Sequence, residues 1–186
     1  MRQQEAGGHL YVVVSGPPGS GKSTVAPPLA DGLGLPLLAK DTIKEALLVS
    51  WPAADVDDSR RTGGAAMEIM FALAREFPGG AVLEANFHRS LAVGPIGALP
   101  GRTVEVFCRC RREVALQRYR ERAAGRHGGH FDDRRTDADI WHDEVSRPVG
   151  GDGGGDWPVL EIDTNAPVDV EEVLARIGSV AEGPAA

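Results

Sequence analysis

A glycine-rich stretch near the start of the chain constrains the fold more than any other feature. Residues 16–24 read GPPGSGKST and follow directly on the apolar run LYVVV. The fixed positions of the pattern G-x-x-x-x-G-K-[ST] are filled by Gly16, Gly21, Lys22 and Ser23. A chance match is easier than usual in a chain with 24 glycines. However, a genuine phosphate-binding loop needs a strand before it and a helix after it, and both are indicated here, so the sequence predicts such a loop.

The loop also predicts which residues contact a bound nucleotide. Its glycines permit backbone dihedrals that point several N–H groups at phosphate oxygens, and the helix that follows adds its positive end. Lys22 is expected to reach the β- and γ-phosphates, and the Ser23 hydroxyl to bind Mg²⁺. The predicted nucleotide contacts in the loop are Gly16, Pro18, Gly19, Ser20, Gly21, Lys22, Ser23 and Thr24. ATP and Mg²⁺ are therefore the expected cofactors.

Strand-like and helix-like segments alternate along the chain. Strands are predicted at residues 9–15, 35–40, 79–87, 103–110 and 157–163. Helices are predicted at residues 21–33, 41–50, 58–77, 111–125, 136–145 and 168–177. This alternation predicts an α/β fold of three layers with a central five-stranded parallel sheet, formed as a single domain over residues 1–186. Loose tails are expected at residues 1–8 and 182–186.

Prolines and glycines interrupt this pattern at two places. Pro27 and Pro28 fall inside the first predicted helix, where a proline removes a hydrogen bond and clashes with the preceding turn, so a kink or an early break is expected. The glycine-rich segment VGGDGGGD at residues 149–156 lacks a following Lys-Ser/Thr and helix. It is therefore predicted to be a flexible connector and not a second phosphate loop.

Composition excludes several classes of protein. The net charge of −7 argues against a dedicated duplex-DNA binder, which needs a basic surface. The two cysteines, Cys108 and Cys110, lie in one apolar run and favour buried thiols over a disulfide framework or a zinc site. No apolar run reaches the roughly 20 residues that span a bilayer. These features predict a cytoplasmic protein without a membrane segment.

Asp41 and Lys44 follow the second predicted strand, in the segment KDTIK. Ligands of open α/β sheets bind at the carboxyl ends of the strands, so Asp41 is expected on the same rim as the phosphate loop. There it could accept a proton from a hydroxyl, while Lys44 could hold an anionic part of the acceptor. The alternative is that Asp41 serves as the helix N-cap, and an N-cap carboxylate can do both jobs.

With these segments in place, the chain resembles the small P-loop kinases of the nucleoside-monophosphate-kinase-like group. It is most similar to the branch that holds chloramphenicol phosphotransferase, zeta toxins, the phage polynucleotide 5′-kinase and many kinases inferred from sequence as AAA-family ATPases. The resemblance implies that Asp41 is the base for the acceptor hydroxyl. Polynucleotide kinases have an Arg three residues after that Asp, where this chain has Lys44, a related but not equivalent cation.

The resemblance also implies a helical lid, over about residues 112–148. Arg118, Arg122 and Arg126 recur at a four-residue spacing, which places them on one helical face if the helix extends that far. Lid arginines of such kinases cover the triphosphate and stabilise the charge that develops during transfer. The three arginines thus join Asp41 and Lys22 as expected catalytic residues, and Arg118 is also an expected nucleotide contact. The alternative is a solvated charged face.

Two further strand ends carry candidate site residues. Glu84 is expected either to hold Mg²⁺ through water or to be a structural carboxylate, because an acid that closes an apolar strand near a phosphate loop can serve either purpose. The residues expected to line the acceptor pocket are Asn86, His88 and Arg89. Kinases of this group pass the segment after the fifth strand beside the adenine, which implies nucleotide-base contacts from Thr164 and Asn165.

The function expected from these observations is an ATP-dependent kinase that phosphorylates a hydroxyl of a small molecule, such as an antibiotic, a sugar or a nucleoside. One alternative is a polynucleotide 5′-hydroxyl kinase, against which the net charge of −7 counts, so a nucleic-acid partner is not expected. The other is a nucleotide-binding regulatory ATPase. A monomer or a homodimer is the expected assembly.

Overall fold

The computed structural model describes residues 8–123 and 125–181. Its strands are β1 (His9–Ser15), β2 (Leu37–Ala39), β3 (Gly80–Glu84), β4 (Gly101–Arg109) and β5 (Val159–Asp163). Every neighbouring pair is parallel, and the strand order is β2-β3-β1-β4-β5. The predicted five-stranded parallel sheet is thus confirmed. The expected loose tails lie outside the described residues, apart from Gly8.

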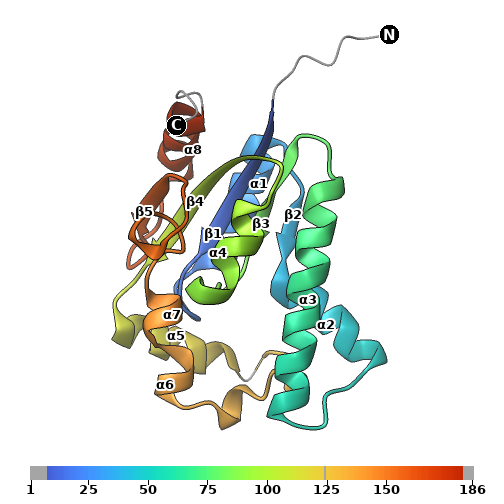
Figure 1. Ribbon diagram of the computed structural model, residues 1–186. Helices are drawn as coiled ribbons and strands as arrows, with labels where there is room; N and C mark the ends of the chain where they lie inside the picture. The colour runs from blue at the N-terminus through green and yellow to red at the C-terminus, as the bar shows by residue number, and fades with distance from the viewer. Residues whose placement is uncertain (1–7, 124, 182–186) are drawn as a thin grey trace.

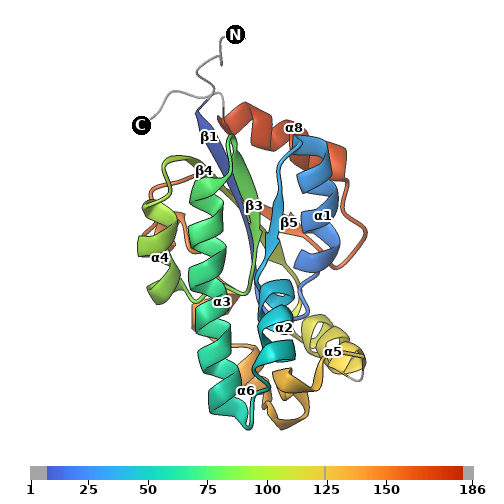
Figure 2. The same cartoon turned by 90° about the vertical axis from the view of Figure 1, so that its right-hand side faces the viewer.

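Helices cover both faces of this sheet. They are α1 (Lys22–Leu33), α2 (Lys40–Ser50), α3 (Val56–Glu76), α4 (Arg89–Gly97), α5 (Arg112–Ala123), α6 (Asp137–Ile140), α7 (Asp143–Ser146) and α8 (Val170–Ala181), with short 3-10 helices η1 (Gly128–His130), η2 (Asp132–Arg134) and η3 (Gly151–Gly153). Figure 2 shows α3 and α4 on one face and α1 and α8 on the other, which makes three layers. None of the described helices combines the length and the apolarity needed to cross a membrane.

Strand β1 shows why the sequence reads as a continuous apolar run. Tyr11 and Val13 pack into the cluster on the α3 and α4 side, whereas Val12 and Val14 pack into the cluster on the α1 and α8 side. All four are completely buried. A central parallel strand that is covered on both faces needs apolar residues at every position, so the alternation of an exposed strand is absent.

Helix α1 is not broken at Pro27 and Pro28, and the predicted early break is therefore wrong. The helix continues through both prolines to Leu33. Each proline removes one backbone hydrogen bond in the second turn. On either side of the pair, the helix buries Val25, Ala26, Leu29 and Ala30 against the sheet, while Pro27 faces solvent. Packing of the buried face keeps the helix continuous despite the lost bonds.

The helices also differ from the prediction in their boundaries and in their number. The second helix begins at Lys40, so β2 is only three residues long. The segment predicted as one helix over residues 136–145 is two, α6 and α7, because Trp141 and His142 between them are extended. Helix α4 was not predicted at all, since its nine residues RSLAVGPIG contain two glycines and a proline and show no clear period.

The glycine-rich segment 149–156 is held to the sheet by a buried carboxylate, contrary to the predicted flexible connector. Glu105, on β4, is fully buried. Its two carboxylate oxygens accept hydrogen bonds from Ser15 Oγ (2.5 Å), Val149 N (2.9 Å), Gly150 N (2.7 Å) and Trp157 Nε1 (3.1 Å). The sequence signal was a charged residue inside the apolar run TVEVF, at a position whose neighbours all point into the core.

The two cysteines lie in the core as predicted. Cys108 and Cys110 are buried and are free thiols. Burial raises the pKa of the Cys108 thiol to about 12, so this thiol is neutral and unreactive at neutral pH.

A separate group of elements lies across the carboxyl edge of the sheet. Residues 112–148, which we call the cover segment, contain α5, η1, η2, α6 and α7, with residue 124 outside the described part. Figure 1 shows this segment and α2 at the lower end of the molecule, where β1, β3 and β4 end. Its apolar residues Leu116, Tyr119 and Ile140 form a cluster of their own, with Trp141 packed against it.

Candidate active site

The phosphate loop connects β1 to α1 at the carboxyl edge of the sheet. Gly19 and Gly21 have φ angles of 80° and 91°, in the left-handed region that glycine adopts without strain. Gly19 also packs directly on α5, since a Cβ there would lie 2.1 Å from the Ala115 carbonyl oxygen. Lys22 folds back over the loop, and its Nζ donates to the Pro17 carbonyl oxygen at 2.9 Å. Glycine is therefore required at position 19 by the loop and by the helix that covers it.

Lys22, the first residue of α1, and Glu84, the last residue of β3, are ionisable groups that line the same site. Burial lowers the pKa of Lys22, and the charges of Glu84 and Asp41 oppose that shift. Burial and the negative charge of Asp41 raise the pKa of Glu84, while Lys22 and Arg122 oppose the rise. These mutual effects place Lys22, Glu84, Asp41 and Arg122 within electrostatic reach of one another.

The loop fits a nucleotide phosphate. In the described part of the chain, the N–H groups of Lys22 and Ser23 open the helix without a carbonyl acceptor. The Ser20 hydroxyl is buried and has no hydrogen-bond partner among the residues that the structure describes. These groups and the Lys22 ammonium are donors without an anion to receive them. Ser23 is exposed and Glu84 is half-buried at the same cavity, which fits a hydrated Mg²⁺ between a hydroxyl and a carboxylate.

Asp41 lies on the same rim as the phosphate loop, but it does not cap its helix. The N-cap position is Ala39, and Asp41 is the second residue of α2. Its carboxylate binds cations instead of backbone N–H groups: Lys40 Nζ is 3.2 Å away and Arg126 NH2 is 2.6 Å away. Burial opposes ionisation, but Lys40, Arg126 and His130 outweigh it and hold the pKa of Asp41 well below its usual range. Asp41 is therefore a carboxylate throughout the neutral range.

The three arginines spaced by four residues do not share one helical face. Helix α5 ends at Ala123, so Arg126 lies beyond it in the following loop, where it bridges Asp41 and Asp132. Arg118 donates to the Thr164 carbonyl oxygen at 2.9 Å. Arg122 lines the cavity, and its charge acts on Lys22 and Glu84. The helix is too short for the expected common face.

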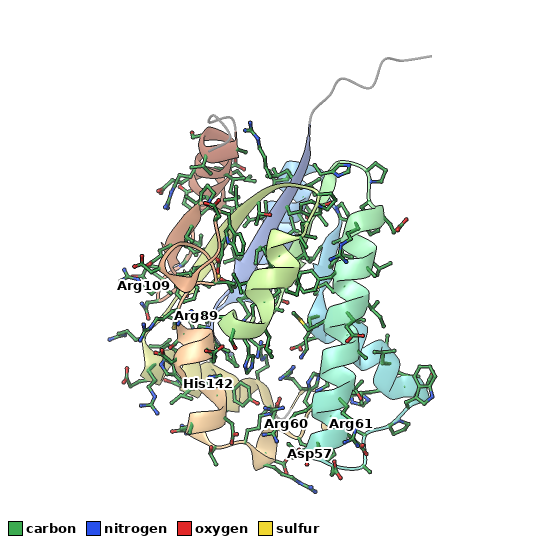
Figure 3. The ribbon with its side chains drawn as sticks, in the orientation of Figure 1. Asp57, Arg60, Arg61, Arg89, Arg109 and His142 are labelled. Carbon is green, nitrogen blue, oxygen red and sulfur yellow. The ribbon has the colours of Figure 1, made fainter. Side chains whose placement is uncertain are left out.

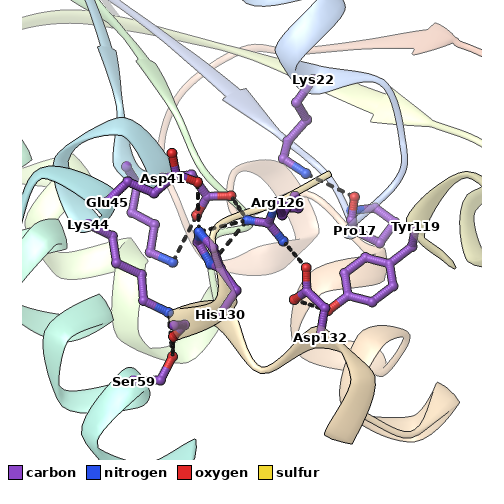
Figure 4. Close-up of polar contacts among 12 residues, drawn as sticks. Pro17, Lys22, Asp41, Lys44, Glu45, Ser59, Tyr119, Arg126, His130 and Asp132 are labelled. Atoms are coloured by element: carbon purple, nitrogen blue, oxygen red, sulfur yellow. Dashed lines mark hydrogen bonds and ion pairs between the residues drawn. The ribbon is translucent and has the colours of Figure 1, made fainter. Parts of the chain in front are cut away.

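Polar contacts tie the cover segment to α2 and α3, as Figure 4 shows. The Arg126 guanidinium contacts Asp132 Oδ2 at 2.8 Å, and Tyr119 OH donates to the other oxygen of the same carboxylate. His130 Nε2 lies 2.8 Å from Glu45 Oε1 on α2. From α3, Ser59 Oγ donates to the Gly129 carbonyl oxygen at 2.7 Å. The pairs that join the cover segment to α2 and α3 lie 70 and 85 residues apart, so spacing in the sequence offers no signal for them.

Lys44 lies one helical turn after Asp41 and is almost completely buried, with 2% of its surface exposed. Its Nζ donates to Ser59 Oγ at 2.6 Å. Burial and the positive charge of Lys40 lower the pKa of Lys44 to about 8, against the opposing charge of Asp41. Lys44 is thus a buried amine whose charge depends on pH close to neutrality.

A cavity of about 920 Å³ joins the phosphate loop to these residues. Lys22, Ser23 and Glu84 line one end, and Asp41 and Lys44 line the other. Apolar side chains from α3 and α4 form part of its wall, namely Met67, Phe71, Leu91, Ala92 and Pro95. The phosphate loop and Asp41 therefore open into one continuous space.

The residues after β3 divide between this cavity and the surface around it. Asn86 and His88 line the cavity, and the His88 ring lies 5.1 Å from that of His142, in the cover segment. Arg89 does not line it, because its side chain extends towards α7, where NH1 is 3.8 Å from Asp143 (Figure 3). Trp51 is exposed at the end of α2, away from the cavity lining.

The segment after β5 lies beside the phosphate loop. The Thr164 side chain approaches Gly21, where a Cβ would be 3.5 Å away. Asn165 Oδ1 accepts from Arg111 N at 3.0 Å, which fixes this segment to the start of α5. Arg118 completes the arrangement through its bond to the Thr164 carbonyl oxygen. Thr164 and Asn165 therefore lie outside the 920 Å³ cavity but next to the loop that would hold the phosphates.

Solved structures with the same architecture include several kinases. A candidate kinase from Chloroflexus aurantiacus matches with a TM-score of 0.80 and 28% sequence identity, over 92% of this chain and 98% of the other. A gluconokinase from Sinorhizobium meliloti matches with a TM-score of 0.56 and 22% identity, over 92% and 93% of the two chains. A shikimate kinase from Acinetobacter baumannii, in complex with shikimate, matches with a TM-score of 0.58 and 19% identity, over 94% of this chain and 93% of the other.

No protein-family model matches the chain, and no curated protein sequence matches it. Its relationships are therefore visible in the arrangement of the sheet, the loop and the cover segment. At 28% identity and nearly full mutual coverage, the Chloroflexus protein shares the overall fold of this chain. The chain has the fold and the phosphate loop of a small ATP-dependent phosphotransferase of the P-loop kinase type.

Proposed function

We propose that this protein is a kinase that transfers the γ-phosphoryl group of ATP to a hydroxyl of a small molecule. One observation carries the proposal: the phosphate loop and the Asp41 carboxylate line the same cavity, whose volume of about 920 Å³ leaves room for an acceptor beside Asp41. A nucleotide switch needs no such second compartment beside its phosphates. A kinase needs a group at the acceptor hydroxyl and cations over the transferring phosphoryl.

On the donor side, the chain supplies cations and N–H groups to the phosphates. ATP with Mg²⁺ supplies the transferable phosphoryl group. Lys22 leaves the Pro17 carbonyl oxygen to bind phosphate oxygens, and the N–H groups of Lys22 and Ser23 point at the same anion. Ser23 and Glu84 are the residues that would hold the metal, and Thr164 and Asn165 are the candidates beside the adenine.

On the acceptor side, Asp41 accepts the proton of the attacking hydroxyl. In the present arrangement Arg126 forms an ion pair with Asp41 and, together with Lys40, holds the pKa of Asp41 low. When Arg126 turns to the phosphates, it adds positive charge where negative charge develops and leaves Asp41 more basic. The cover segment then acts as a lid. Arg122 and Arg126 lie at the phosphoryl group, and Arg118 positions the segment after β5 that is proposed to lie beside the adenine.

A transfer assay with isotopically labelled γ-phosphate, run on a panel of hydroxylated metabolites and on a 5′-hydroxyl oligonucleotide, tests the function. Transfer to a small molecule is expected and transfer to the oligonucleotide is not, even at low salt, where phosphate contacts are strongest. Labelling of the oligonucleotide alone would assign the acceptor to nucleic acid. Nucleotide-dependent assembly without any transfer would favour a regulatory ATPase.

The Lys22→Met variant tests the donor half separately. Loss of a charge-assisted hydrogen bond to phosphate costs about 1.5–3 kcal/mol, so the affinity for AMPPNP should fall roughly 10- to 100-fold. Isothermal calorimetry measures this fall. Lys40→Met is the matched control, because Lys40 pairs with Asp41 and not with the phosphate loop, and its affinity for AMPPNP should stay near that of the wild type. Equal losses in both variants would remove Lys22 from the phosphate site.

A further inference from the structure

We propose that the acceptor is a hydroxylated anion, whose carboxylate or phosphate group is held by Lys44 and Arg135 while its hydroxyl faces Asp41. This inference rests on the kinase function proposed above and names the acceptor class of the same site. Arg135 follows η2 in the cover segment, and it lines the cavity together with Lys44 and Asp41.

Lys44 is a buried cation with an incomplete set of partners. An ammonium has three donors, and in the described residues only Ser59 Oγ receives one of them. Ser59 uses its own proton on the Gly129 carbonyl oxygen, so it acts towards Lys44 as a neutral acceptor. The nearby Asp41 carboxylate is already paired with Lys40 and Arg126. A buried charge without a counter-ion is unfavourable, and a bound anion would supply the missing partner.

Arg135 is likewise left for a ligand. Three acidic residues near it in the cover segment are paired with other arginines, namely Asp132 with Arg126, Asp137 with Arg120 and Asp139 with Arg60, and a fourth, Asp133, is exposed. The part of the chain that the structure describes shows no ion pair for Arg135 itself. Its planar guanidinium offers two parallel N–H groups, which match a carboxylate or a phosphate.

The two cations act on one another across the cavity. Burial is the largest cause of the lowered pKa of Lys44, and the charges of Lys40, Arg135 and Arg126 lower it further. The charge of Arg135 also contributes, after burial and His142, to the lowered pKa of His88. The charges of Lys44 and Arg135 therefore repel one another, and an anionic ligand bound to both would relieve that repulsion.

Helix α3 leaves room for the carbon skeleton of such a ligand. Gly63 and Gly64 lie adjacent in its interior and both line the cavity. Glycine is unfavourable inside a helix, which suggests that the missing side chains have a use there. A Cβ at Gly63 would lie 3.6 Å from Lys40 Nζ, and one at Gly64 would project into open space. Because Lys40 contacts Asp41, the missing side chain at Gly63 leaves space in the cavity near the expected hydroxyl position.

Matched pairs of compounds test the charge of the acceptor. The pairs are gluconate with gluconamide, shikimate with methyl shikimate, and glycerol 3-phosphate with glycerol. Binding is measured by calorimetry in the presence of saturating AMPPNP and Mg²⁺, so that the phosphate loop is already filled. At least one anion should bind roughly 10- to 100-fold tighter than its neutral counterpart, as one or two charge-assisted hydrogen bonds provide. The carboxylate and phosphate pairs show which anion the site takes.

Two variants assign the preference to the named residues. Lys44→Met and Arg135→Met should each reduce anion binding about tenfold or more and leave the weaker binding of the neutral compounds unchanged. Arg134→Met is the matched control, because Arg134 is exposed and lies over the Phe131 ring at 4.9 Å, outside the cavity lining. The control should bind both members of each pair like the wild type.

The pH dependence of anion binding gives a second readout. Lys44 has a pKa of about 8, set by burial and by the charges of Lys40, Asp41, Arg135 and Arg126. It is charged below that pH and neutral above it, so anion affinity should fall as the pH rises through about 8. In Lys44→Arg the guanidinium stays charged, and the affinity should remain level over the same range.

The two proposals can fail independently. The anionic acceptor would be overturned if the wild type bound anions and neutral compounds equally, or if the anion preference survived in both methionine variants. Labelled transfer to a neutral alcohol would in that case still support the kinase function. Binding of anions that depends on Lys44 and Arg135, without transfer to any compound, would support the anion site and count against the kinase function.

Discussion

An Asp41→Asn variant is expected to transfer phosphate about 10²–10⁴ times more slowly than the wild type, the loss typical of removing one general base. Asparagine has nearly the same shape as aspartate, and its side-chain oxygen can still accept a hydrogen bond from Arg126 or Lys40. It cannot accept the proton of the attacking hydroxyl. The fall should therefore appear in the rate constant of the transfer step, measured under single-turnover conditions, while the affinity for AMPPNP stays close to that of the wild type.

Asp132→Asn separates this role from an effect on Arg126. Asp132 is the other carboxylate that Arg126 contacts, and it also accepts from Tyr119. Substitution there disturbs Arg126 without touching the residue that faces the phosphate loop. A loss in Asp132→Asn as large as that in Asp41→Asn would mean that both act by positioning Arg126, and the assignment of Asp41 as the base would not stand.

The second large effect is expected from Glu105→Ala, which should lower the free energy of unfolding by about 3–5 kcal/mol. Glu105 is fully buried and accepts from four donors. Each buried donor left without an acceptor costs on the order of 1–3 kcal/mol, although some relaxation and entry of water reduce the sum. Equilibrium unfolding in urea, followed by circular dichroism, measures the change. Glu105→Gln keeps one acceptor oxygen and should lose less.

Glu161→Ala is the matched control for this loss. Glu161 lies on the neighbouring strand β5, is exposed, and pairs with Arg109 at 3.7 Å. Exposed ion pairs contribute only about 0–1 kcal/mol, so the control should unfold almost like the wild type. Similar losses in the two alanine variants would show that strand position, and not the buried carboxylate, accounts for the effect of Glu105.

The sheet and the phosphate loop could be predicted because each leaves a local pattern. A strand such as β1, buried on both faces, is a continuous apolar run, and the loop has fixed residues at fixed spacing. Asp41 could be placed on the rim for the same reason, since it follows directly on a strand. Helix α4 could not be predicted, because Gly94 and Pro95 remove the helical signal and burial of Ala92 and Ile96 keeps the helix in place.

The rest of the site depends on contacts between residues far apart in the sequence. Arg126 meets Asp41 across 85 residues, and Glu105 meets the glycine-rich segment across 44 and 45. Neither pairing has a spacing rule. Arg135 looked like one of several arginines in a polar run, and it is distinguished from the adjacent Arg134 by its place in the cavity lining.

The cover segment is fixed to the sheet at both ends. At its start, the backbone of Gly19 packs against Ala115. Just beyond its end, the Glu105 carboxylate accepts hydrogen bonds from the amides of Val149 and Gly150. Between these anchors its contacts with α2 and α3 are mainly polar, apart from the Leu48 side chain of α2 against Gly129, whereas the apolar cluster of Leu116, Tyr119 and Ile140 belongs to the segment itself. Lifting the segment thus breaks ion pairs and hydrogen bonds but leaves both apolar cores packed. Access to the cavity and the stability of the protein are consequently set by different residues, and selection can alter one without weakening the other.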